Sequence, residues 1–305
     1  MTVEPSLLEL LSAGERAAFH AAPGSAVPLL ESAVTLATRQ SRPAEAAAAS
    51  WLLGVALAAS GRYGAALTVL QPVLHSGERG GQVPEVLVFG ALAGATVASI
   101  HRQLGRHDAA AEYDGRGLAL AAGSAEAAFD CRLGLAADAV GVGAAATAAT
   151  ELARAAALVP AGEQWWRQRV RLDWVRAEVA LLGERADVAV QAARSALDRA
   201  AAAHAPRHVA KSLLFLGVAQ LQVSDPTAVE TLQRAAVLAE SLGTVPLVWP
   251  ARAVLGAHLA GGDPPGSVKH LAAARTAVAA IAAELPVELR TQWLARPDIA
   301  ELLDT

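Results

Sequence analysis

The 305-residue chain has few cysteine, lysine and aromatic residues, and each shortage excludes a class of protein. The single cysteine, Cys131, cannot form an internal disulfide, and this favours a reducing compartment. Basic residues are spread thinly and the formal net charge is −4, so nucleic-acid binding has little electrostatic support. Aromatic residues are only 4% of a chain that is 54% hydrophobic, so the core must consist mainly of Ala, Leu and Val.

Membrane and export signals are also missing from the sequence. The longest charge-free runs are rich in Ala and Gly and are shorter than a membrane span needs. The segment Met1–His20 carries several charged residues instead of a basic stretch followed by an apolar one. We therefore expect a soluble cytoplasmic protein that has no membrane or nucleic-acid partner.

Four glycines, each between Ala-rich apolar stretches, are the main pattern that is present. Gly61, Gly105, Gly141 and Gly183 follow one another at 44, 36 and 42 residues. Recurrence at such intervals is typical of stacked helical repeats. Abundant alanine favours helix, and no region shows the sustained alternation of β-branched residues expected of a sheet. We expect each glycine to end the first helix of a pair in a left-handed turn.

The first repeat shows the pattern most clearly. It reads Leu53-Gly54 followed at helical spacing by Leu57, Gly61, Tyr63, Ala66, Leu70 and Val73. Further copies start at Val97-Ala98, Leu133-Gly134, Val175-Arg176, Leu216-Gly217 and Leu255-Gly256. A partial copy precedes them, with one helix over Ser6–Ala22 and a second from Gly24.

These positions resemble the tetratricopeptide repeat (TPR) over roughly residues 45–280, although the spacing is nearer 40 residues than the usual 34 or so. The resemblance implies an all-α, right-handed solenoid of about six helical hairpins with a C-terminal cap. We expect one domain over residues 1–305, with a partial repeat at 1–42, repeats at 43–280 and the cap at 281–305. The long spacing and the tail from Leu285 to Leu303 also resemble the helical arrays of large bacterial signalling ATPases and transcriptional activators, here as a free-standing array.

Motifs for catalysis, metal or cofactor are weak. Gly141-x-Gly143-x-x-Ala146 matches a dinucleotide fingerprint, but a repeat helix precedes it where that motif needs a strand. His204 and His208 are four residues apart, but Pro206 lies between them and no other ligand is near in sequence. Cys131 has no evident histidine partner. We therefore expect no catalytic residue, no metal and no cofactor.

In the TPR family the first helices line the concave face, and the resemblance carries that role to fixed offsets in each copy. The candidate partner-binding residues are Trp51, Val55, Leu92, Ser99, Arg102, Cys131, Leu135, Asp138, Asp173, Lys211 and Leu214. A second candidate surface is the Trp- and Arg-rich helix marked by Trp165, Trp166 and Arg169. The interpretation that we favour for these large rings is that they fill gaps between unequal repeats, with the arginines stacked over them at the surface.

The composition and the repeat predict a non-enzymatic protein-interaction scaffold. An apolar groove with sparse charges suits a peptide or an amphipathic helix. The alternative is a regulatory module that senses a small apolar metabolite or a signalling peptide by changing its curvature, because solenoid contacts are only between neighbours. The sequence leaves both open, together with homo-oligomer formation.

Overall fold

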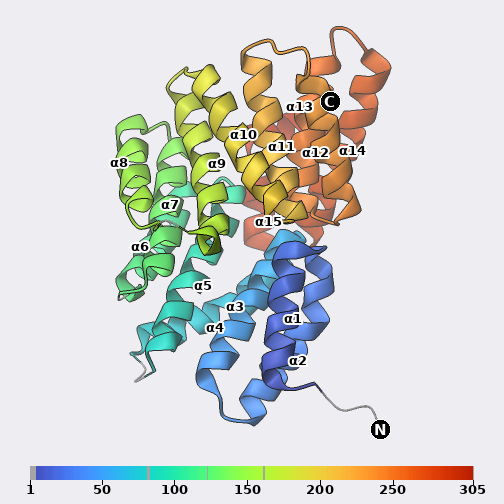
Figure 1. Cartoon of the computed structure of the whole chain (residues 1–305). Helices are drawn as coiled ribbons and strands as arrows, with labels where there is room; N and C mark the ends of the chain where they lie inside the picture. The colour runs from blue at the N-terminus through green and yellow to red at the C-terminus, as the bar shows by residue number, and fades with distance from the viewer. Residues whose placement is uncertain (1–4, 81–82, 122, 161, 305) are drawn as a thin grey trace.

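The computed structural model describes residues 5–80, 83–121, 123–160 and 162–304, and every regular element in these ranges is a helix (Figure 1). Seven antiparallel hairpins follow one another: α1 (Leu7–His20) with α2 (Val27–Arg39), α3 (Pro43–Ala59) with α4 (Tyr63–Glu78), α5 (Pro84–Gln103) with α6 (His107–Leu120), α7 (Ala125–Gly141) with α8 (Ala145–Ala156), α9 (Trp166–Leu182) with α10 (Ala186–Ala202), α11 (Pro206–Gln222) with α12 (Ala228–Ser241), and α13 (Val245–Leu259) with α14 (Pro264–Ala283). Two short helices, α15 (Val287–Leu294) and α16 (Pro297–Asp304), end the described chain, and short 3₁₀ segments precede α2 (Pro23–Ala26) and α9 (Glu163–Trp165).

The expected all-α repeat fold is confirmed. The six hairpins from α3 to α14 correspond to the six predicted copies, and α1 with α2 corresponds to the partial N-terminal copy. The first four residues and the last residue of the chain lie outside the described ranges. The helix starts follow from local chemistry, since α3, α5, α11 and α14 each begin at a proline, whose fixed φ suits the first helical position.

Small residues let the two helices of a hairpin approach closely. A Cβ added at Gly54 of α3 would lie 2.4 Å from Leu70 of α4, and one at Gly217 of α11 would lie 2.5 Å from Leu232 of α12. Leu70 and Leu232 are both fully buried, so neither side chain has room to move. The glycine of Leu53-Gly54 is therefore required by packing, as the repeat pattern predicts.

The left-handed turns follow the prediction only in part. Gly61 and Gly105 have φ of 83° and 75°, as expected. In the third copy Gly143 takes this role instead of Gly141, because α7 continues through Gly141. In the fourth copy Glu184 has φ of 55°, and Gly183 remains right-handed as the C-cap of α9.

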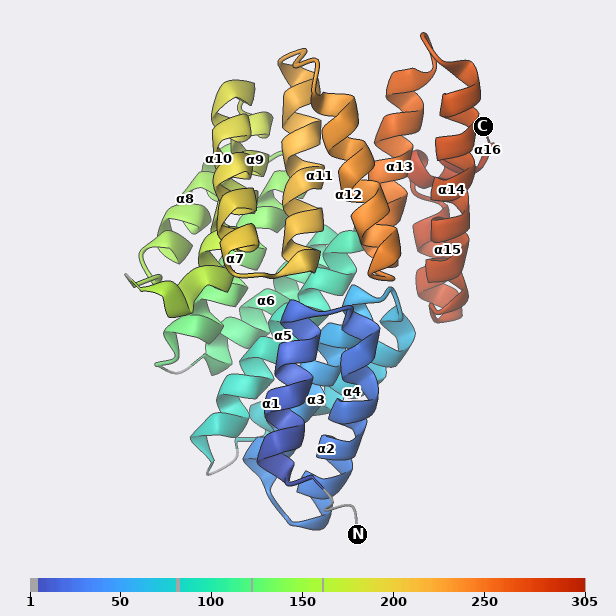
Figure 2. The same cartoon turned by 45° about the vertical axis from the view of Figure 1, so that its right-hand side comes forward.

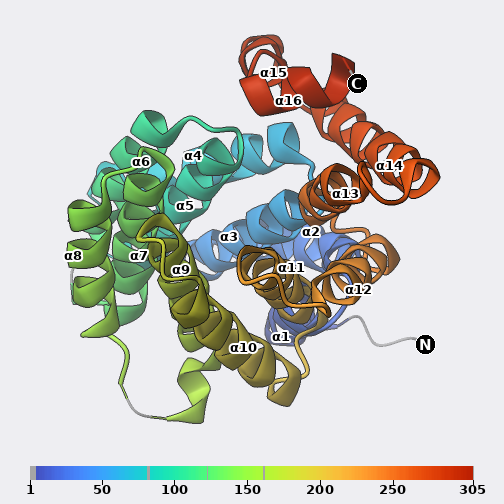
Figure 3. The same cartoon turned by 90° about the horizontal axis from the view of Figure 1, so that it is seen from above.

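The array curves until its last hairpins lie against its first ones (Figures 2 and 3). The ring of Phe19 in α1 contacts the imidazole of His208 in α11, with centroids 6.4 Å apart. Further contacts join α4 to the end of α14, where the amide of Gly64 donates to the carbonyl of Glu284 over 3.1 Å. The guanidinium of Arg296 donates to the carbonyl of Gln103 at the end of α5. We call this line of contacts the seam.

Helix α5 is long and apolar enough to cross a membrane by length and composition alone. Most of its apolar residues are buried within the array, between the neighbouring hairpins. Such a helix is equally typical of a protein core, and the packing places α5 there.

Candidate functional site

The first helices of the hairpins enclose two adjacent cavities at the centre of the array. The seam cavity, about 130 Å³, lies where the first and last hairpins meet, and its wall includes Phe19, Trp51, Val55, Thr96, Asp130, Arg167, Arg207, His208, Thr244 and Leu247. The inner cavity, about 320 Å³, lies between α5, α7 and α9, and its wall includes Arg102, His107, Leu133, Ala137 and Glu178. Both are lined by Ala95, Ser99, Gln103, Asp130, Arg171, Trp174 and Lys211, so the two cavities are adjacent, and we refer to them together as the central channel.

Two tryptophans are held in the channel wall by hydrogen bonds. The indole of Trp51 in α3 donates to the hydroxyl of Thr96 in α5 over 3.2 Å, and the indole of Trp174 in α9 donates to Ser212 in α11 over 2.8 Å. The imidazole of His208 stacks on Trp174 with centroids 5.4 Å apart. Burial, followed by the surrounding cations, holds the pKa of His208 well below its usual range, so this ring is neutral.

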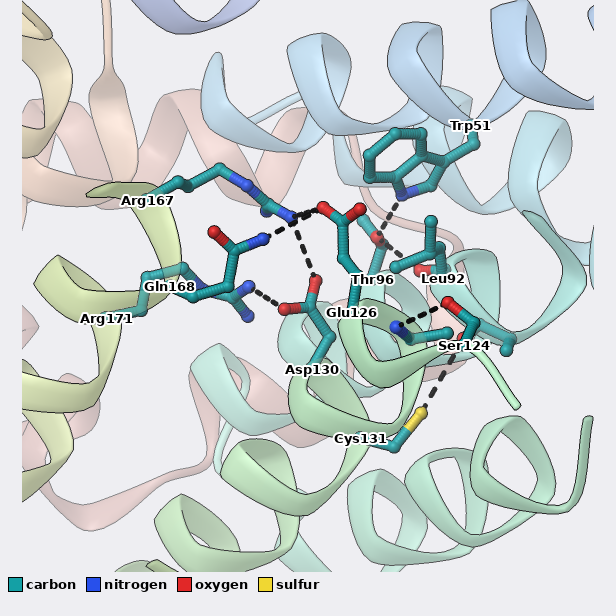
Figure 4. A network of polar contacts seen from close by, with 12 residues as sticks. Trp51, Leu92, Thr96, Ser124, Glu126, Asp130, Cys131, Arg167, Gln168 and Arg171 are labelled. Atoms are coloured by element: carbon teal, nitrogen blue, oxygen red, sulfur yellow. Dashed lines mark hydrogen bonds and ion pairs between the residues drawn. The ribbon is translucent and has the colours of Figure 1, made fainter. Parts of the chain in front are cut away.

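Four basic residues project into the channel from α9 and α11. Arg167 and Arg171 both pair with Asp130 of α7, and Arg167 also donates to Glu126 over 2.8 Å (Figure 4). The carboxylate of Asp130 lies between the two guanidinium groups and is itself buried. These two arginines are therefore largely neutralised within the wall.

Arg207 and Lys211 stand one helical turn apart on α11 and lack such partners. Among the residues that the structure describes, neither has an oppositely charged side chain within ion-pair distance, and the Nε atom of Arg207 is buried without a hydrogen bond. Burial lowers the pKa of Lys211 to about 8, against the opposing attraction of Glu178. Burial, then Arg171 and Arg167, lowers the pKa of Arg207 to about 10. The lowered pKa values mean that the surroundings disfavour the charged form of both side chains.

Arg102 anchors a separate network at the far side of the inner cavity. Its guanidinium bonds Asp138 of α7 over 2.8 Å and Asp114 of α6 over 2.6 Å. Both carboxylates are buried, and burial raises the pKa of Asp114 well above its usual range although Arg102 opposes this. This network ties three consecutive helices together behind the channel wall.

The structure brings some of the predicted residues to the channel and places others elsewhere. Trp51, Val55, Ser99, Arg102 and Lys211 line it. Six others do not line either cavity: Leu92 and Cys131 are buried in the core, Leu135 is half-buried, Leu214 packs against α13, and Asp138 and Asp173 are held by arginines. The thiol of Cys131 is fully buried against the carbonyl of Ala91, and burial raises its pKa well above the usual range.

The second candidate surface lies outside the channel. Trp165 and Trp166 line a hollow beside α1, and Trp166 with Arg169 lines another beside the end of α10. The ring of Trp166 also contacts His20 and His208, at centroid distances of 5.4 and 5.0 Å. Trp166 therefore packs across the seam on the outer side of the array.

Several channel residues were not among the sequence candidates: Asp130, Arg167, Arg171, Trp174, Glu178, Arg207 and His208. On α9 the residues at 167, 171, 174 and 178 share one helix face, whereas the expected stripe contained Asp173. A shift of one residue turns a helix by about 100°, so the stripe that lines the cavities is adjacent to the predicted one. The signal that could have identified this stripe is the recurrence of charged residues on α9 at intervals of four, three and four residues.

No group of three His, Cys, Asp or Glu side chains in the described part of the chain is arranged to hold a metal ion. Pro206 begins α11, so His204 precedes the helix, whereas His208 lies inside it and is buried. The channel offers fixed cations, aromatic faces and hydrogen-bonding groups, which are suited to holding a ligand.

No protein-family model matches the chain, and no curated protein matches it in sequence. Its fold is similar to solved structures of Rap proteins. A Rap protein complexed with competence and sporulation factor aligns with a TM-score of 0.66 and 12% identity, over 98% of this chain and 85% of that one. The apo form of RapI and aspartyl phosphate phosphatase F from Bacillus subtilis each align with a TM-score of 0.50, at 10% and 12% identity, over 98% and 100% of this chain and 84% of each of those chains. At these identities the likeness shows the fold, a TPR-like helical repeat.

Proposed function

We propose that the chain is a non-enzymatic cytoplasmic interaction protein that binds a short peptide in its central channel. The observation that carries this proposal is the pair of adjacent cavities, whose walls combine Trp51 and Trp174 with fixed polar groups. Rings supply apolar contact and the polar groups supply orientation, which is the usual composition of a ligand site. The Rap protein that aligns over nearly the whole chain is complexed with a factor, which supports a ligand-binding role for the shared fold.

The position of the channel supports a regulatory use of that binding. The seam cavity is lined by both ends of the array, by Phe19 and Trp51 from the first hairpins and by His208 and Leu247 from the last ones. A ligand held there contacts both sides of the seam, so its binding favours the closed curvature. The alternative function, ligand sensing, rests on this contact with both sides of the seam. Because the wall is charged, the ligand in that case is polar in part.

A channel-filling substitution tests the proposal. Ser99 lines both cavities, so Ser99→Trp places a large ring in the channel. Thr150→Trp adds the same ring on exposed helix α8 and serves as the matched control. Each full-length protein is immobilised and incubated with a random library of short peptides, and retained peptides are identified by mass spectrometry.

We expect wild type and Thr150→Trp to retain the same peptides and Ser99→Trp to lose them. Circular dichroism and melting temperature establish that all three proteins fold. If wild type retains no peptide above the level of Ser99→Trp, the channel is not a peptide site and the proposal is wrong.

A further inference from the structure

The seam cavity has an excess of positive charge. Four basic side chains line it, and Asp130 is the one carboxylate among the described residues of its wall. Arg167 and Arg171 share that carboxylate, and Arg167 also uses Glu126. Within the described wall of the seam cavity the charges of Arg207 and Lys211 therefore have no partner, and Lys211 is attracted only by Glu178 on the side of the inner cavity.

Arg207 and Lys211 are placed to act together. They lie four residues apart at the start of α11, on the same face of the helix, and both line the seam cavity. The ammonium of Lys211 sits 4.6 Å from the centroid of Trp174, and this contact fixes its position without neutralising it. Two positioned donors with unused hydrogen-bonding capacity point into one small space.

An unpaired cation that is removed from water destabilises the folded protein, and cations of like sign side by side add to that cost. A bound anion reverses both effects, because it gains charge-assisted hydrogen bonds from donors that are already in place. The rest of the wall combines apolar and aromatic side chains, among them Phe19, Val55 and Leu247, with polar ones such as Thr96, Ser99 and Gln103. Such a site selects a small anionic group attached to a body that is apolar in part.

We propose that Arg207 and Lys211 form a carboxylate-binding subsite in the seam cavity, so that the peptide of the proposed function, on which this inference rests, is an acidic one. The carboxylate is either the C-terminal group of the peptide or an Asp or Glu side chain beside an apolar residue. Both sources present the same planar anion to the two donors. Arg171 and Lys211 line both cavities, so the rest of the peptide extends from this subsite toward the inner cavity.

The test compares each retained peptide with its uncharged counterpart. Peptides selected by wild type from the random library of short peptides are synthesised as the free acid, as the C-terminal amide, and with each Asp or Glu replaced by Asn or Gln. Their affinities are measured by calorimetry on wild type and on the variant Arg207→Gln/Lys211→Gln. The control is Arg234→Gln/Lys269→Gln, which removes the same charges from exposed positions on α12 and α14.

We expect one carboxylate to strengthen binding to wild type and to the control about tenfold or more. In Arg207→Gln/Lys211→Gln the ratio of the two affinities, charged peptide over uncharged counterpart, should fall toward one while the uncharged peptide still binds. Loss on amidation identifies the C-terminal carboxylate, and loss on Asp or Glu replacement identifies a side chain. The variant should melt no lower than wild type, since it removes partly buried charge that has no ion-pair partner among the described residues.

Three outcomes overturn the inference in different ways. Peptides that bind the channel with no preference for a carboxylate, or with a preference for basic residues, refute the subsite and leave peptide binding intact. A carboxylate preference that survives in Arg207→Gln/Lys211→Gln assigns it to other residues. Retention of no peptide by wild type refutes both the subsite and the proposed function.

Discussion

The hydroxyl of Thr244, at the start of α13, donates a 2.8 Å hydrogen bond to the carbonyl oxygen of Ala59, at the end of α3 and 185 residues earlier in the chain. Thr244 is buried, so this bond is shielded from water. It is part of the seam that brings the last hairpins onto the first ones and so gives the channel its second wall. The stability of the seam can be measured through bonds of this kind.

Replacing Thr244 by valine should weaken the seam. The substitution keeps the shape of the side chain but removes the donor, and the buried carbonyl of Ala59 then loses a partner. We expect the free energy of unfolding to fall by about 1–3 kcal/mol. Urea denaturation followed by circular dichroism measures this. Thr276→Val, which removes an exposed hydroxyl that bonds within α14, should change stability by much less.

A methyl group at Gly64 should separate the two sides of the seam. A Cβ there would lie 2.3 Å from the carbonyl oxygen of Glu284, a backbone atom that cannot turn aside. We expect Gly64→Ala to lower the free energy of unfolding by about 1–3 kcal/mol. Gly115, an exposed glycine within α6, has open space around it, so Gly115→Ala should raise stability by up to about 1 kcal/mol. Equal effects of the two substitutions in thermal melts would contradict the close approach at Gly64.

Arg102 should be the most costly charge to remove from the interior. Arg102→Met leaves Asp114 and Asp138 buried without their shared partner. We expect a loss of about 3–5 kcal/mol in the free energy of unfolding. Neutralising both carboxylates as well, in Arg102→Met/Asp114→Asn/Asp138→Asn, should recover much of that loss. If the single variant unfolds at the same urea concentration as wild type, the network contributes little.

Acid should destabilise the protein through two buried histidines. Burial, then Arg106, lowers the pKa of His101 to about 4, and His101 is stacked on Tyr113. The pKa of His208 is lowered by burial and then by the nearby charges of Arg207, Arg167, Arg171 and Lys211. Below an unfolded-state pKa of about 6.5, the unfolded chain binds protons that the folded chain does not, so stability is greatest above that pH and falls as pH decreases.

We expect this effect to reach about 2 kcal/mol for each histidine between pH 6.5 and pH 5. Urea denaturation of wild type and of His101→Gln/His208→Gln at pH 7.5 and pH 5 separates it from other titrations, since the variant should lose less stability on acidification. His204→Gln, at an exposed position in the turn before α11, should behave like wild type. An identical pH response in all three proteins would show that the buried rings are not neutral.

The repeat fold could be predicted because its requirements are local. Each hairpin needs a small residue where its helices cross and a large one to fill the gap, as Gly54 and Leu70 do. Alanine supplies the helix propensity and prolines mark several helix starts. These features lie within about 20 residues of one another, so a single sequence displays them.

The channel stripe could be predicted on α3 and α5 but not on α9. Where Gly54 packs on its own partner helix, the family offsets place Trp51 and Val55 in the wall. In α7, Gly134 faces Asp114 of the preceding hairpin instead, and in α9 the residue at the small position, Arg176, points to solvent. The orientation of a helix about its axis depends on which neighbour it packs against, and that choice is not visible in the helix itself.

The sequence by itself determined the helix pairs, their order and the small residues on which they pack, because each depends on contacts between neighbours. Only the tertiary structure decided the seam, in which Ala59 meets Thr244, and the unpaired state of Arg207 and Lys211 beside it. Curvature is the sum of small rotations at every hairpin interface, so no local pattern encodes where the ends meet. The contact between the two ends of the array determines which charged side chains are buried and which are paired. The chemistry of the cavities depends on both.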